Sequence, residues 1–165
     1  MKNTKNKETL NEIAVYLIFG VFTTIVAMGT YFGILWIGEK ILKLSPDDKS
    51  FNAVRAVAEI LQWLFAVLFA FFTNKKWVFT NADQSMSTSK QFIRFSASRL
   101  ATLGVDAIIT FGTVWILLGV GYKEISLIGI DISADLIAKL LASVVVVISN
   151  YVLSKIFVFK KNNVQ

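Results

Sequence analysis

The chain has 165 residues, enough for one domain or one small helical assembly. Hydrophobic residues make up 55% of the sequence and charged residues 17%, against about 25% charged in a typical soluble domain, so the composition excludes a disordered chain and disfavours a water-soluble globule. The absence of Cys and His removes disulfides, thiolate metal sites and the commonest general base, and the net charge of +6 comes from clusters between long apolar stretches rather than from one basic face.

A membrane-spanning helix needs about 20 predominantly apolar residues, and four stretches of the sequence meet this requirement. They cover residues 13–37, 52–73, 92–118 and 134–153. The first stretch is too long for the apolar core of a cleavable signal peptide. Polar segments that carry the only proline and several turn-forming residues separate the stretches, at residues 39–50, 80–90 and 119–133. We therefore predict an all-α membrane protein with four transmembrane helices.

The distribution of Lys and Arg predicts the orientation of these helices, because cytoplasmic segments carry an excess of cations. With both termini in the cytoplasm, 11 Lys and Arg residues fall on the cytoplasmic side and 6 on the outer side. Seven of the 11 acidic residues also fall on the outer side. We therefore predict a cytoplasmic segment at residues 1–12, a transmembrane domain at 13–161 and a cytoplasmic tail at 162–165.

A shift of 80 residues aligns the second half of the chain with the first. Residues 75–79 then lie on residues 155–159, and Ala58, Leu61 and Val67 meet identical residues. Two helices per repeat would give both halves the same orientation in the membrane, and internal repeats recur in transporters. The alternative is that any two apolar helices with basic ends look alike.

The strongest single candidate for a functional residue is Asp106, near the middle of the third apolar stretch. A carboxylate at that depth costs at least about 2.5 kcal/mol, and ionisable groups inside a membrane usually serve a function. Arg99 lies seven residues earlier, on nearly the same helix face, so the sequence predicts a cation and an anion along one stripe. The alternative is a structural ion pair that fixes helix packing.

A second group of charges lies near the predicted outer ends of the second and fourth stretches. Arg55 and Glu59 are four residues apart and share a helix face, as do Asp135 and Lys139. The 80-residue shift places each residue of one pair on a residue of opposite charge in the other, which suggests salt bridges between the helices. The alternative is that these side chains extend to the interface. Glu59 and Lys139 lie deepest and are the candidates for ligand binding.

The two predicted cytoplasmic helix ends read TNKKWVF and SKIFVFKK. Lys provides a point charge for phosphate, and aromatic residues favour the interface, so the two ends could bind an anionic lipid headgroup. The alternative is cationic anchoring with an aromatic belt. Lys75 and Lys155 coincide in the repeat, and for these two residues we favour a binding function.

The segments AVLFAFFTNKKWVF, SRLATLGVD and AKLLASVVVVISNYVLSKIFVFKK resemble the GtrA-like family, in particular its branch associated with teichoic acid glycosylation in Gram-positive bacteria. The resemblance covers residues 16–161. The positions that carry over from the family are Asn74, Lys75, Arg99, Asp106, Lys139, Asn150 and Lys155. The sequence departs from the family at Ala27, where relatives often have Asn.

The resemblance implies a multi-pass bacterial membrane protein that moves an undecaprenyl-phosphate-linked sugar across the membrane, between glycosyltransferases that load it inside and use it outside. It implies no cofactor, no metal and no nucleic acid. Arg99 and Lys139 would contact the phosphate from the two sides, and Asp106 would hold Arg99 or accept sugar hydroxyls. Four helices leave little room for a closed pore, so a groove open to lipid, or a site between protomers of a homo-oligomer, is expected.

Two other function classes remain to be weighed. The first is a non-transporting subunit that anchors or stabilises a membrane glycosyltransferase, for which the intramembrane charges would serve packing alone. The second is a small multidrug exporter, but such exporters usually need an acidic residue in the first helix, and residues 13–37 contain none. We do not expect an enzyme, because the sequence lacks Cys and His.

Overall fold

The computed structural model describes residues 2–45, 49–80, 86–122, 125–127 and 130–160. The elements in chain order are α1 (Lys2–Lys40), α2 (Phe51–Thr73), η1 (Asn74–Val78), α3 (Thr88–Gly119), β1 (Ile125–Leu127), β2 (Ile130–Ile132), α4 (Ala134–Leu153) and η2 (Ser154–Val158). Each η element is a single π-helical turn that continues the α-helix before it. The predicted tail at 162–165 lies outside the described residues.

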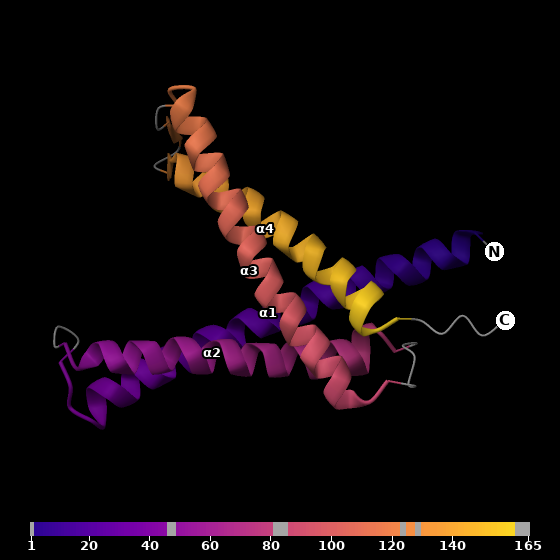
Figure 1. The fold of residues 1–165 in the computed structure, drawn as a ribbon, viewed down its shortest axis with the longest axis horizontal. Helices are drawn as coiled ribbons and strands as arrows, with labels where there is room; N and C mark the ends of the chain where they lie inside the picture. The colour runs from indigo at the N-terminus through magenta and orange to yellow at the C-terminus, as the bar shows by residue number, and fades with distance from the viewer. Residues whose placement is uncertain (1, 46–48, 81–85, 123–124, 128–129, 161–165) are drawn as a thin grey trace. The chain divides into compact units, whose positions relative to one another are not determined.

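The chain divides into two compact units, Met1–Ala82 and Asp83–Gln165. In the first unit α1 packs against α2, and in the second α3 packs against α4 (Figure 1). Both pairs are antiparallel, because residues near the start of one helix contact residues near the end of its partner. We call the end of each unit that carries its π turn the π end.

Four of the helices in the described part of the chain are long and apolar enough to cross a membrane. They are Lys7–Lys40, Phe51–Val78, Thr88–Gly119 and Ala134–Val158, with each π turn included in the helix before it. This confirms the predicted class, an all-α membrane protein with four transmembrane helices. The orientation with both termini in the cytoplasm stays a prediction.

Helix α1 is longer than the sequence suggested, because it begins at Lys2 rather than at Ile13. The segment before the apolar stretch is rich in Lys and Glu, which favour helix, and contains neither Gly nor Pro. With 39 residues the helix is about 58 Å long, well beyond the roughly 30 Å hydrocarbon core of a bilayer. The predicted cytoplasmic segment is therefore helical over its described residues.

The connection between α3 and α4 is more ordered than the predicted loop at residues 119–133. Helix α3 ends at Gly119, and two residues later Gly121 has a φ of 75°, which suits glycine. The N–H groups of Gly121 and Tyr122 donate to carbonyls in the last turn. Strands β1 and β2 then pair as a short antiparallel hairpin. Ser133 caps α4, because its side chain accepts a hydrogen bond from the Leu136 N–H.

The two units repeat each other at a spacing of 80 residues, as the sequence predicted. Ala58 and Ala138 are both fully buried, and both π turns occupy equivalent positions. From residue 74 to 80 and from residue 154 to 160 the order of buried, half-buried and exposed side chains is the same. The match in backbone and burial is stronger evidence for a repeat than the shared basic ends alone.

Candidate functional site

The central contact of the second unit is an ion pair between its two helices. Lys139 on α4 donates to Asp106 Oδ2 on α3 at 2.8 Å. The pair is not sealed inside the unit, since 60% of the Lys139 side chain and 30% of the Asp106 side chain remain exposed. A ligand can therefore reach both charged groups.

The sequence suggested Arg99 as the cation that pairs with Asp106, but the structure gives this place to Lys139. Seven residues separate Arg99 from Asp106, which is about 10 Å along the helix. Helical side chains also point back toward the N-terminus, and the Arg99 guanidinium accordingly lies 4.5 Å from the ring centre of Phe95. The cation that pairs with Asp106 therefore lies on the partner helix, α4, and not on the shared face of α3 that the sequence suggested.

A second polar contact joins α3 and α4, about one turn before Asp106 on α3 and about three turns after Lys139 on α4. The Thr102 hydroxyl donates to Asn150 Oδ1 at 2.9 Å. Thr102 is buried and Asn150 is half-buried. Asn150 was predicted as a site residue, whereas Thr102 was not, although it lies on the stripe that joins Arg99 to Asp106.

Cations gather at the π end of the second unit. The Lys155 ammonium donates to the Tyr151 hydroxyl at 2.8 Å and lies 5.1 Å from the centre of that ring. Arg94 donates to the backbone carbonyl of Phe157 at 3.4 Å. Because α3 and α4 are antiparallel and meet at Thr102 and Asn150, the residues that follow Asn150 lie level with those that precede Thr102. Lys155 and Arg99 therefore lie on the same side of that contact.

Two of these contacts join α3 to α4, and Arg99 and Lys155 lie beside one of them. We call this set of residues the polar seam. Its members are Arg99, Thr102, Asp106, Lys139, Asn150 and Lys155. Lys139 and Lys155 are separated by about 24 Å along α4, which approaches the thickness of the hydrocarbon core. The seam thus has a cation toward each end and hydrogen-bonding groups between them.

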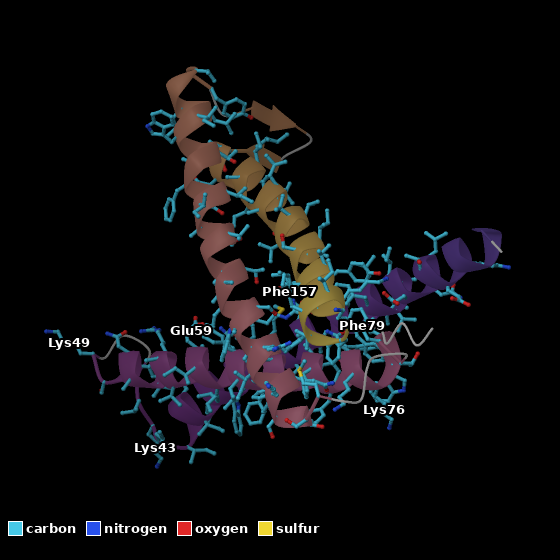
Figure 2. All side chains as sticks on the ribbon, turned by 45° about the vertical axis from the view of Figure 1, so that its right-hand side comes forward. Lys43, Lys49, Glu59, Lys76, Phe79 and Phe157 are labelled. Carbon is cyan, nitrogen blue, oxygen red and sulfur yellow. The ribbon has the colours of Figure 1, made fainter. Side chains whose placement is uncertain are left out.

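The first unit carries the remaining predicted site residues. Asn74 is buried in the first position of its π turn, and the Lys75 ammonium lies 6.0 Å from the ring centre of Phe71. Glu59 is exposed and accepts a hydrogen bond from Gln62. In Figure 2, Lys43 and Lys49 mark one end of this unit, and Lys76 and Phe79 lie toward its π end.

Along α1, the first unit has apolar residues where α3 of the second unit has its seam residues. The 80-residue shift places Phe19 on Arg99, Phe22 on Thr102 and Val26 on Asp106. The Phe19 ring stacks on Trp77, with 5.2 Å between centroids. The two repeats therefore share a cationic π end, through Lys75 and Lys155. They differ in polarity at the equivalent positions of α1 and α3.

Sequence reasoning missed two partners that the structure supplies. Tyr151 lies one helical turn before Lys155, so the spacing alone was a usable signal. Gln62 lies three residues after Glu59 in the same way. Neither residue is charged, so neither has the compositional signal that marks Glu59 and Lys155 within an apolar stretch.

Comparison with known proteins places these features in a family. Residues 15–159 match the model described as GtrA/DPMS, transmembrane domain. An uncharacterized membrane protein, YwcD, of Bacillus subtilis is 33% identical over 147 residues, which cover 88% of this chain and 94% of that protein. The cell wall teichoic acid glycosylation protein GtcA is 32% identical in Listeria innocua and 30% identical in Listeria monocytogenes, each over 93% of this chain and 88% of the relative.

The match spans nearly all of both repeats, from early in α1 to the residue that follows η2. Together with the four spanning helices, it identifies a multi-pass bacterial membrane protein. The chain belongs to the GtrA/DPMS transmembrane-domain family.

Proposed function

We propose that the chain moves an undecaprenyl-phosphate-linked sugar across the membrane, for glycosylation of teichoic acid or a related surface polysaccharide. The family and the names of the Listeria relatives support a role in the glycosylation of cell-wall polymers. The finer proposal rests on one observation, the polar seam between α3 and α4. Such a lipid has apolar tails that can stay in the bilayer, so only its phosphate and sugar need a polar path.

The seam offers the groups that this headgroup requires. Lys155 and Arg99 would receive the phosphate at the π end, and Lys139 would receive it farther along α4. Asn150, which accepts a hydrogen bond from the buried Thr102 hydroxyl, and Asp106, beside Lys139, can hydrogen-bond to sugar hydroxyls. Within the first unit, Lys75, Asn74 and Glu59 stay proposed contacts of the headgroup, Lys75 and Asn74 at its π end.

The role proposed is transport rather than catalysis. The sequence has no Cys and no His, and the carboxylate in the seam is held by a lysine. The expected partners are the lipid-linked sugar, the surrounding lipids and the glycosyltransferases that act before and after transport. The exposed charges of the seam are also compatible with a homo-oligomer that shares the site.

Purified full-length protein in proteoliposomes tests the proposal. A fluorescent polyprenyl-phosphate sugar is placed in both leaflets, and a membrane-impermeant quencher is added outside. With a translocating protein, fluorescence falls to near zero, whereas about half persists in protein-free vesicles. If half persists with the protein present, the chain does not transport alone. The alternative, an accessory subunit of a glycosyltransferase, would then be favoured.

A further inference from the structure

We infer that Asp106 selects the sugar-loaded lipid over the bare lipid phosphate, an inference that rests on the proposed transport function. In the empty protein Asp106 neutralises Lys139. When a lipid phosphate takes its place on Lys139, the carboxylate loses its partner. A sugar attached to that phosphate can replace the partner, because its hydroxyls donate hydrogen bonds.

The geometry allows this exchange. The Lys139 ammonium has three N–H donors, and one of them is directed at Asp106 Oδ2. More than half of the Lys139 side chain is exposed, so an anion can approach without moving either helix. A phosphate competes with Asp106 for this ammonium, because both are anions that accept its hydrogen bonds.

The cost of the exchange depends on the ligand. An unpaired carboxylate in a medium of low dielectric constant is strongly unfavourable. In its dianionic form, a bare phosphate monoester offers no donor and carries two negative charges next to Asp106. A sugar phosphodiester carries one negative charge and several hydroxyls, and a hydrogen bond to a charged group is worth about 1.5–3 kcal/mol. Asp106 therefore lowers the affinity for the bare lipid phosphate and raises the affinity for the sugar phosphodiester.

Four probes separate charge from hydroxyls. They are undecaprenyl phosphate, its methyl ester, and undecaprenyl phosphate that carries glucose or N-acetylglucosamine. The methyl ester has the single negative charge of the sugar phosphodiester but no hydroxyls. In nanodiscs, the wild-type protein should bind one of the two sugar lipids about tenfold more tightly than the methyl ester.

Asp106→Asn should remove most of this preference. The variant keeps the shape of the side chain but no longer competes for Lys139, so the methyl ester should bind more tightly than it does to wild type. Lys139→Gln should weaken all charged probes. In the double variant Asp106→Asn/Lys139→Gln, the gain in affinity for the methyl ester should disappear, because the gain acts through Lys139.

Glu39→Gln is the matched control. Glu39 and Lys40 form an exposed ion pair, at 2.7 Å, in the other unit. The substitution changes the net charge by the same amount as Asp106→Asn, so it reports any general attraction of anionic lipids. It should leave the preference of the protein for sugar lipids unchanged.

The outcomes separate this inference from the function on which it rests. If wild type translocates the sugar lipid but binds the methyl ester equally well, the selective role of Asp106 is wrong and the transport function stands. An unchanged preference in a folded Asp106→Asn protein has the same meaning. If wild type neither binds nor translocates any probe, both proposals fail. Equal binding of the methyl ester and the sugar lipid by wild type would overturn the inference even if Asp106→Asn does not fold.

Discussion

Asn74 and Ser154 occupy the same place in the two repeats, each as the first residue of a π turn. Both are buried, and the carbonyl of each accepts a hydrogen bond at 2.8 Å from the N–H five residues later, in Phe79 and in Phe159. Single π turns are rare and occur often at functional sites. Their recurrence at one position of both repeats indicates that this backbone geometry belongs to the common design of the two units.

Ser154→Ala should stabilise the protein. The Ser154 hydroxyl is fully buried and makes no hydrogen bond within the described residues. A buried unsatisfied polar group costs about 1–3 kcal/mol, so its removal should raise the free energy of unfolding by about 1 kcal/mol. Unfolding in mixed detergent measures this quantity. A lower stability would indicate that the hydroxyl has a partner in the folded membrane protein.

Asp106 and Lys139 should be energetically coupled, whereas Arg99 and Asp106 should not. Asp106 and Lys139 form an ion pair, whereas Arg99 lies about 10 Å along the helix from Asp106. In double-mutant cycles with Ala, the first pair should show a coupling of about 0.5 kcal/mol or more in unfolding free energy. The effects of Arg99→Ala and Asp106→Ala should add. Coupling of Asp106 to Arg99 and not to Lys139 would support the Arg99–Asp106 pairing that the sequence suggested.

Arg99→Ala and Asp106→Ala should each abolish sugar decoration of the wall while the protein stays in the membrane. The reason is that both belong to the polar seam, although at different levels. Decoration is measured in whole cells by lectin binding, and protein level by immunoblot of membranes. Normal decoration in both variants would leave these residues a structural role only.

The charge of Lys139 and Lys155 should matter more to transport than their shape. Lys→Arg at either position should retain part of the activity, and Lys→Gln should lose most of it. Loss at Lys155 should impair loading from the cytoplasmic leaflet, and loss at Lys139 should impair release outside. Oriented vesicles assayed from each side separate the two effects. Lys49→Gln, at an exposed lysine outside the seam, is the control. Parent rates in both Gln variants would reduce these lysines to topological anchors.

Gly38 should be required for the packing of α1 against α2. A Cβ at this position would lie 2.7 Å from Val54 Cγ1 and 3.1 Å from the Phe51 ring. Gly38→Ala should therefore lower the unfolding free energy by about 1–3 kcal/mol, and a second change, Val54→Ala, should recover part of it. Gly20→Ala is the control, because a Cβ there meets nothing within 4 Å. Equal stability of both Ala variants would contradict the close packing of the two helices.

The natural absence of Cys allows a direct test of topology. Single cysteines at Asp47 and Ser126 should react with an impermeant thiol reagent added to intact cells, and one at Ser85 should react only after lysis. The expectation follows from the distribution of Lys and Arg. Labelling of the Ser85 variant in intact cells would overturn the orientation with both termini in the cytoplasm.

Much of the fold could be read from the sequence, because spanning helices have a strong compositional signal. The fourth apolar stretch, at residues 134–153, coincides with α4, and the 80-residue repeat appears in both backbone and burial. The π turns could not be predicted, since a hydrogen bond between residues five apart leaves no distinctive side-chain pattern. Nor could the start of α1 at Lys2, because hydropathy marks the membrane and not the end of a helix.

The candidate site was only partly predictable for a related reason. Asp106 and Lys139 were both identified as unusual charges within apolar stretches, but their pairing depends on how α3 and α4 face each other. A sequence read one helix at a time favours partners on the same helix, such as Arg99. Thr102 and Tyr151 carry no charge, so the sequence did not indicate their contacts.

Under the proposed transport function, the apolar side chains of α1 limit how many headgroups one chain can carry at once. Phe19, Phe22 and Val26 stand where Arg99, Thr102 and Asp106 stand in the second repeat, so the first helix pair lacks the polar residues that α3 gives to the seam. The transport stoichiometry should therefore be one lipid per chain per cycle, although the chain is built from two copies of the same hairpin. The duplication has therefore supplied a second helix pair, but not a second set of these polar residues.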